Sequence, residues 1–170
     1  MSHRSATLAD LPQIVDIFNA AIPLLATAET SPITVDSRLD WFGQHSQARY
    51  PIWVDEREGV LVGWLSISRY YAQSAYDATG EISVYVAPAY HRQGVGRGLL
   101  EAAVTKAPAL GFKTLVGYVW AHNEASIRLF EACGFQRWAR LPEIAEIDSV
   151  PYDTVIVGRH VVSRKDQECR

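Results

Sequence analysis

The feature that most constrains the fold of this sequence is the segment 81–110, in which a strand, a glycine turn and a helix follow one another. Residues 81–86 alternate polar and apolar side chains as a half-buried strand does, and Pro88 ends the strand. Three glycines within 94–98 let the backbone turn tightly, so that successive N–H groups can point at one spot. Because a helix begins there, its unpaired N–H groups and its dipole favour an anion, and a pyrophosphate is the natural guest.

Two familiar phosphate-binding motifs do not fit this glycine turn. The sequence lacks the P-loop pattern G-x-x-x-x-G-K-[ST]. The dinucleotide pattern G-x-G-x-x-G fails because Leu99 stands where the third glycine is required. A glycine-rich turn that serves only tight packing is the alternative interpretation, so the segment by itself predicts an anion site of unassigned type.

Strands and helices alternate along the rest of the chain, after an initial hairpin. We expect helices from the N-cap Thr7 to Pro23, from the cap Asp36 through Phe42, from the glycine turn to Gly111, and from the cap Asn123 to Gly134. We expect strands at 51–55, 60–68, 81–86, 114–120, 135–139 and 154–162. This order predicts the α/β (α+β) class, with one mixed sheet and helices on both of its faces. We place a single domain at 1–162 and a polar C-terminal tail at 163–170.

Composition and charge exclude several classes of protein. The chain has 170 residues and is 48% hydrophobic, which suffices for one buried core without disulfides or a metal. Lys and Arg number 16 against 19 Asp and Glu, so we expect no basic face for nucleic acid. The apolar runs are far shorter than the ~20 residues of a membrane span. Residues 1–5 carry no signal-peptide core, so we expect a cytoplasmic protein. Neither the cysteines nor the histidines show metal-ligand spacing, and we expect no metal.

A second motif, at 123–135, changes the interpretation of the first. By itself it indicates an N-cap, an amphipathic helix and a closing glycine. Together the two motifs resemble the GNAT superfamily of N-acetyltransferases, and the resemblance runs from residue 4 to about residue 160. The matching positions are Val86-Ala87-Pro88, Gly94-Val95-Gly96, Asn123, Ser126 and Gly134-Phe135. A closer resemblance, to the phosphinothricin acetyltransferase-like branch, lies in Thr27-Ala28-Glu29-Thr30, Arg38 to Phe42, Ala75-Tyr76 and Glu81 to Val86.

The resemblance implies a mostly antiparallel sheet in which one strand pair splays beyond Val86 at an acetyl-CoA site. The cofactor-binding residues that it implies are Val84, Tyr85, Val86, Arg92, Gln93, Gly94, Val95, Gly96, Arg97, Asn123 and Ser126. The freed strand would hold the pantetheine arm, and a backbone N–H there would polarise the thioester carbonyl. The glycine turn would take the pyrophosphate, counted from Pro88 so that Gly94 and Gly96 are the family's glycines. A register two residues later, through Gly98, breaks that spacing.

The same resemblance implies acetyl transfer to the primary amine of a small amino-acid-like acceptor, of the phosphinothricin or methionine sulfone type. The amine would attack directly in a ternary complex, and Glu81 would act as the base through a water. A solvated carboxylate at the start of a strand is the alternative for Glu81. The acceptor-binding residues that we expect are Tyr71, Gln73, Tyr76 and Ser83. Small enzymes of this family are often homodimers, and we expect a homodimer here.

Three positions depart from the family pattern. His91 stands where Arg or Gln is usual, and Phe130 stands where many relatives have a proton-donating Tyr or His. Gln73 replaces an arginine, and a neutral amide cannot make a bidentate charge-assisted pair with a carboxylate. Two other classes therefore stay open, namely a catalytically silent acyl-CoA-binding sensor module and a nucleotide- or phosphate-binding α/β protein outside this family.

Overall fold

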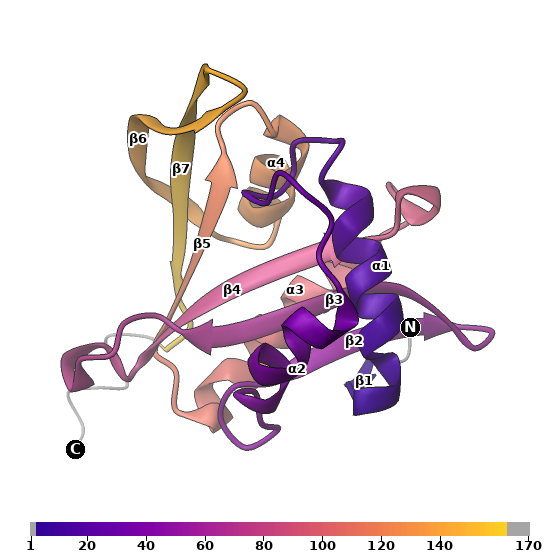
Figure 1. Ribbon diagram of the computed structural model, residues 1–170. Coiled ribbons are helices and arrows are strands. Elements are labelled where there is room, and N and C mark those ends of the chain that lie inside the picture. Colours follow the sequence, from indigo (N-terminus) through magenta and orange to yellow (C-terminus); the bar gives the residue numbers. More distant parts are fainter. Residues whose placement is uncertain (1–2, 163–170) are drawn as a thin grey trace.

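A computed structural model describes residues 3–162 and shows one seven-stranded sheet in the order β1-β2-β3-β4-β5-β7-β6 (Figure 1). Its strands are β1 His3–Ser5, β2 Ile52–Arg57, β3 Val60–Arg69, β4 Thr79–Val86, β5 Thr114–Trp120, β6 Gln136–Ile147 and β7 Val150–His160. Its α-helices are α1 Leu11–Ala21, α2 Val35–Gly43, α3 Val95–Lys106 and α4 Glu124–Ala132. The expected tail at 163–170 lies outside the described residues.

The sheet opens between its two central strands. All neighbouring strands pair antiparallel except β4 and β5, which are parallel and pair only over Thr79–Glu81 and Thr114–Val116. Beyond that point β4 stays paired with β3 while β5 follows β7, so the two strands diverge (Figure 1). The expected splayed pair is confirmed, but pairing ends at Glu81 and not beyond Val86. Residues 82–86 consequently have no partner strand on the β5 side.

Helices cover both faces of the sheet, as the alternation of strands and helices predicts. On one face α1 and α2 pack against β2 and β3, for example through Ile14 on Val54 and Trp64. On the other face α3 and α4 pack through a larger core that includes Leu99, Ile127 and Leu115. None of the helices in the described part of the chain has the length and apolar character of a membrane span.

One expectation near the N-terminus is wrong, and one strand there has no counterpart among the expected elements. Helix α2 is capped by Thr34, whose hydroxyl accepts from the Ser37 N–H (3.2 Å), and Asp36 lies inside the first turn. The short edge strand β1 has too few residues to show a period, so no alternation of polar and apolar residues predicts it.

The C-terminal strands are longer than the expected 135–139 and 154–162. Strands β6 and β7 form a hairpin whose turn residues, Asp148 and Ser149, both have positive φ. Such a turn usually contains glycine, so a turn without glycine is not predicted from the sequence. Pro142 lies within β6, which is the edge strand, and beside a register shift, where a proline is tolerated.

Candidate active site

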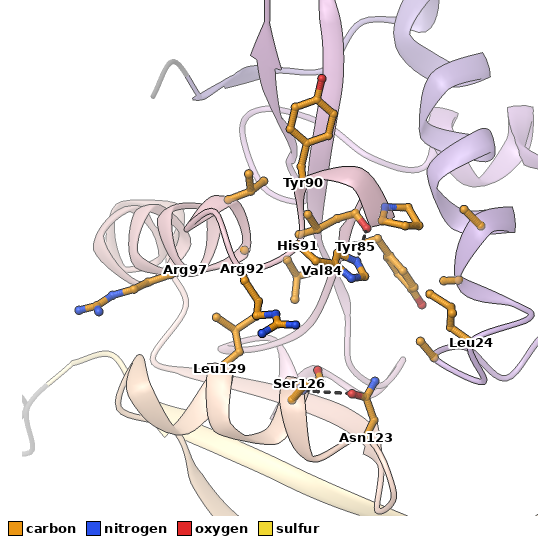
Figure 2. A pocket seen from close by; sticks show the side chains of 18 of the residues that line it. Leu24, Val84, Tyr85, Tyr90, His91, Arg92, Arg97, Asn123, Ser126 and Leu129 are labelled. Carbon is orange, nitrogen blue, oxygen red and sulfur yellow. Dashed lines mark hydrogen bonds between the residues drawn. The ribbon is translucent and has the colours of Figure 1, made fainter.

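A cavity of about 460 Å³ lies where the sheet opens, beside the start of α3 (Figure 2). Gly94 caps α3 with φ 81°, and the first intrahelical bond recorded there runs from the Gly98 N–H to the Gly94 carbonyl (2.9 Å). The N–H groups of the first turn therefore have no partner within the helix and point toward its N-terminal end. Because Gly98 lies inside α3, the turn glycine is Gly94, which supports the register counted from Pro88. This end of α3 is built to hold an anion.

The strand β4 forms one wall of this cavity. Val84, Tyr85 and Val86 line it, on the stretch of β4 that has lost its partner β5. The imidazole of His91 donates from Nε2 to the Val86 carbonyl (3.0 Å). His91 therefore holds the end of β4 beside the glycine turn, a role that its family position did not predict.

The helix α4 forms the facing wall (Figure 2). Asn123 caps the helix as predicted, because its side-chain oxygen accepts from the Ser126 N–H (3.1 Å). Asn123, Ser126 and Leu129 all line the cavity. Leu24, from the segment after α1, closes a third side, and the adjacent Leu25 carbonyl accepts from His122 Nε2 (3.0 Å). Sequence reasoning missed this third side because nothing local links residue 24 to α4.

The structure brings ten of the eleven expected cofactor residues to the cavity. These are Val84, Tyr85, Val86, Arg92, Gly94, Val95, Gly96, Arg97, Asn123 and Ser126. Arg92 reaches toward α4, whereas Arg97 points away (Figure 2) and donates to Glu101 (2.7 Å). The side chain of Gln93 is not brought there, because it bonds Arg57 (3.1 Å) and the Ala89 carbonyl (3.0 Å). A part for Gln93 in cofactor binding stays a prediction, and of its groups only the backbone is free for it.

A second cavity, of about 170 Å³, lies on the face of the sheet that α1 and α2 cover. Glu81 and Ser83 of β4 line it together with aromatic side chains that include Trp41 and Trp64. Tyr85 lines both cavities, and its ring packs 5.0 Å from that of Phe18 and 4.8 Å from that of Trp64. Tyr85 is therefore the wall that the two cavities share.

Glu81 is a half-buried carboxylate at the point where β4 and β5 part. Burial raises its pKa above the ordinary value of 4.5. Ser68 lies directly opposite on β3, and its hydroxyl contacts His45 Nε2 (3.1 Å). The other ring nitrogen of His45 donates to the Trp41 carbonyl (2.7 Å), so Nε2 accepts from Ser68. A carboxylate with a raised pKa in a cavity has the properties of a general base.

The structure brings one of the four expected acceptor residues to this second cavity. Ser83 lines the second cavity, but Tyr71, Gln73 and Tyr76 lie exposed in the connection between β3 and β4. The rings of Tyr71 and Tyr76 pack on each other and on Tyr70, with centroids 4.4–5.8 Å apart. Their packing within this exposed segment keeps them out of the cavity, and a role in acceptor binding stays a prediction for them.

Two further side chains on α4 face the core. Phe130 is buried against Phe135, with ring centroids 5.0 Å apart, and does not line either cavity. Cys133 is buried, and burial raises the pKa of its thiol, which disfavours the thiolate that a nucleophile needs. Within residues 3–162 no group of His, Cys, Asp or Glu side chains is arranged to hold a metal ion.

A sheet that opens at one parallel strand pair, with an anion-binding helix start at the opening, defines a GNAT-type fold. The sequence profile of the "Acetyltransferase (GNAT) family" matches residues 11–135. The chain belongs to this family of acetyltransferases.

Similar proteins agree with this assignment. One is a Bacillus subtilis (strain 168) protein named "Putative phosphinothricin acetyltransferase YwnH", 39% identical over 95% of this chain and 99% of its own. Another is the L-methionine sulfoximine/L-methionine sulfone acetyltransferase of Salmonella typhimurium, 33% identical over 85% of each chain. A crystal structure of a GNAT superfamily phosphinothricin acetyltransferase from Sinorhizobium meliloti in complex with acetyl-CoA aligns with a TM-score of 0.88. It is 27% identical and covers 94% of this chain and 87% of its own.

Proposed function

We propose that this protein transfers the acetyl group of acetyl-CoA to the primary amine of a small amino-acid-like acceptor, of the phosphinothricin or methionine sulfone type. The names of its relatives support this acceptor class, and the crystal structure of a relative with acetyl-CoA supports the cofactor. We also propose that the enzyme is a homodimer, as its family resemblance implies, and that it acts in the cytoplasm.

The observation that carries the proposal is the sharing of Tyr85 by the two cavities. The larger cavity joins an anion-binding helix start to an unpaired strand edge, which fits a long cofactor with a pyrophosphate. The smaller cavity holds Glu81 among aromatic side chains, which fits a small amine. Because Tyr85 borders both, the two cavities adjoin at this residue, which supports binding of an acceptor and a cofactor side by side in one ternary complex.

Acetyl-CoA, when bound, supplies a thioester whose carbonyl carbon is open to attack by an amine. The start of α3 would hold the pyrophosphate, and the free edge of β4 would hold the pantetheine arm by backbone hydrogen bonds. Asn123 and Ser126 would bond that arm from the side of α4. The acceptor must attack as the neutral amine, so Glu81 would take its proton through a water. The amine nitrogen would bond to the carbonyl carbon as the C–S bond breaks. The departing CoA thiolate would take up, through solvent, the proton that the nitrogen loses on forming the amide.

The test follows the release of free CoA thiol from acetyl-CoA with phosphinothricin, methionine sulfone, ordinary amino acids, polyamines and aminoglycosides. Glu81→Gln is expected to lower kcat at least tenfold on amino-acid-like acceptors, because a positioned base contributes ~10²–10⁴-fold. In the unchanged enzyme kcat/KM should rise with pH around a midpoint above 4.5, since burial raises the pKa of Glu81 and the base must be ionised. That step should vanish in Glu81→Gln.

Glu58→Gln, in the exposed turn between β2 and β3, is the matched control and should leave turnover unchanged. Undiminished turnover in Glu81→Gln would contradict only the role of Glu81 as the base, and not the acetyl transfer itself. Tight binding of acetyl-CoA without turnover of any amine would favour the acyl-CoA-binding sensor module. Failure to bind acetyl-CoA would contradict the cofactor itself.

A further inference from the structure

We infer that Arg38 of α2 binds an acidic group of the acceptor inside the cavity that contains Glu81, so that the acceptors are amines bearing a carboxylate. The inference rests on the proposed function and adds the residue that selects the substrate class. It starts from charge, because Arg38 and Glu81 are the two charged side chains among the described residues that line this cavity.

The guanidinium of Arg38 is held in place by aromatic rings. Its central carbon lies 5.2 Å from the ring centroid of Phe18 and 5.6 Å from that of Trp41. Both rings line the same cavity. Cation–π contacts of this kind fix the plane of a guanidinium while leaving its N–H edge available. Arg38 is therefore oriented by packing and not by hydrogen bonds.

The hydrogen-bonding capacity of Arg38 is almost unused. Among residues 3–162 its one ion pair is with Glu29, at 3.6 Å, and involves a half-exposed carboxylate. The structure records no hydrogen bond for the Arg38 guanidinium within residues 3–162, although its side chain is only 26% exposed. A guanidinium carries five N–H donors in a planar fork that matches a carboxylate. An incoming carboxylate would supply the partner that the protein leaves out.

The two charges suit an amino acid. Glu81 would face the amine that must lose a proton, and Arg38 would face the negative group of the same molecule. The aromatic side chains of Trp41, Trp64 and Tyr85 line the same cavity, and such a lining suits an apolar or weakly polar side chain. The cavity volume of about 170 Å³ limits the acceptor to a single small molecule.

The position at which related enzymes carry an arginine does not supply this cation. Gln73 is neutral, exposed and absent from the cavity lining. Arg38 instead reaches the cavity from α2, which covers the face of the sheet opposite to the face that α3 covers. The loss of an arginine at position 73 therefore does not remove carboxylate recognition from this chain.

The test compares two acceptors that differ only in the carboxylate, methionine sulfone and 3-(methylsulfonyl)propan-1-amine. Arg38→Gln should raise KM for methionine sulfone about 10- to 100-fold, as expected for a lost charge-assisted pair, with a smaller change in kcat. The amine without a carboxylate should keep its KM. The KM of Arg38→Lys for methionine sulfone should lie between those of the unchanged protein and of Arg38→Gln, because lysine keeps the positive charge but lacks the planar fork of N–H donors.

Arg140→Gln on β6, whose side chain is exposed and pairs with Asp153, is the matched control and should change neither KM. Thermal unfolding and acetyl-CoA affinity report whether Arg38→Gln retains the fold. Equal loss of turnover with both acceptors would overturn the inference, because it would show a packing role between Phe18 and Trp41.

A failure of the proposed function stays distinguishable. If the unchanged protein acetylates neither acceptor, titration of methionine sulfone in the presence of CoA tests Arg38 directly. Weaker binding to Arg38→Gln than to the unchanged protein would support the inference. Equal binding, or no binding to the unchanged protein, would overturn it.

Discussion

The carboxylate of Asp10 ties together the segments that precede α1. It accepts from both terminal nitrogens of Arg4 (2.7 and 2.8 Å) and from the N–H and hydroxyl of Thr7 (2.7 and 2.9 Å). The bonds from Arg4 lower the pKa of Asp10 to about 2, although burial opposes the shift. Arg4 lies on β1 and also bonds Glu56 of β2, so one buried anion joins the helix start to the sheet edge.

We expect Asp10→Asn to lower the free energy of unfolding at pH 7 by about 2 kcal/mol, the contribution of hydrogen bonds to a charged group. Because the folded pKa lies below the ordinary value of 3.8, the contribution is present above pH 3.8. It is lost as the pH falls toward 2. Urea unfolding of both proteins at pH 7 and pH 3 measures this difference.

Asp16→Asn supplies the matched control, since Asp16 lies exposed on α1 itself. It should change the unfolding free energy by no more than about 0.5 kcal/mol. A deficit in Asp10→Asn that stays constant down to pH 2 would contradict the ionic origin of the stabilisation.

At the scale of elements, Gly63 allows β3 to pass beneath the start of α3. A Cβ at this position would lie 2.7 Å from the Val95 side chain and 3.0 Å from the Tyr85 carbonyl. Val95 begins α3 and Tyr85 borders both cavities. A methyl group at position 63 therefore pushes on two walls of the site without entering it.

We expect Gly63→Ala to destabilise the protein by about 1–3 kcal/mol, as overpacking of a dense core does. It should also weaken acetyl-CoA binding, because α3 and β4 must move apart. Gly43→Ala is the control, since no atom of the described part of the chain lies within 4 Å of its Cβ position. Differential scanning fluorimetry with and without acetyl-CoA measures both effects. Equal stabilisation of both variants by acetyl-CoA would show that the glycine turn moves independently of β3.

The elements that the sequence predicts well are those with a local signal. The predicted strand 114–120 agrees with β5 at both ends. The helix caps Gly94 and Asn123 are predictable because glycine tolerates a positive φ and an asparagine side chain can accept from the first turn of the helix. The sequence does not predict the hairpin of β6 and β7, because its turn residues Asp148 and Ser149 adopt positive φ and neither is glycine. From the sequence, Arg38 belongs only to a family pattern, because the cavity that it lines combines residues of α1, α2, β3 and β4. Such long-range assembly leaves no periodic trace in a single sequence.

At the scale of the whole molecule, the residues that the structure describes leave one aromatic surface exposed. It consists of Tyr70, Tyr71 and Tyr76, which pack on one another, and Tyr118 of β5, which donates to the Tyr70 hydroxyl (3.2 Å). Tyr71, Tyr76 and Tyr118 are 42–50% exposed. Tyrosine is enriched at protein interfaces because its ring buries well while its hydroxyl stays paired.

Light scattering at micromolar concentration should therefore give twice the mass of one chain. Replacing Tyr71 and Tyr76 together by serine is expected to shift the protein toward the monomer, because both rings would leave the exposed surface. Val60→Ser removes a similarly exposed apolar side chain from the first residue of β3 and should leave the mass unchanged. A monomer mass for the unchanged protein would contradict the dimer. A dimer that survives the double replacement would place the contact elsewhere, and the exposed tyrosines would then be free to meet an acceptor.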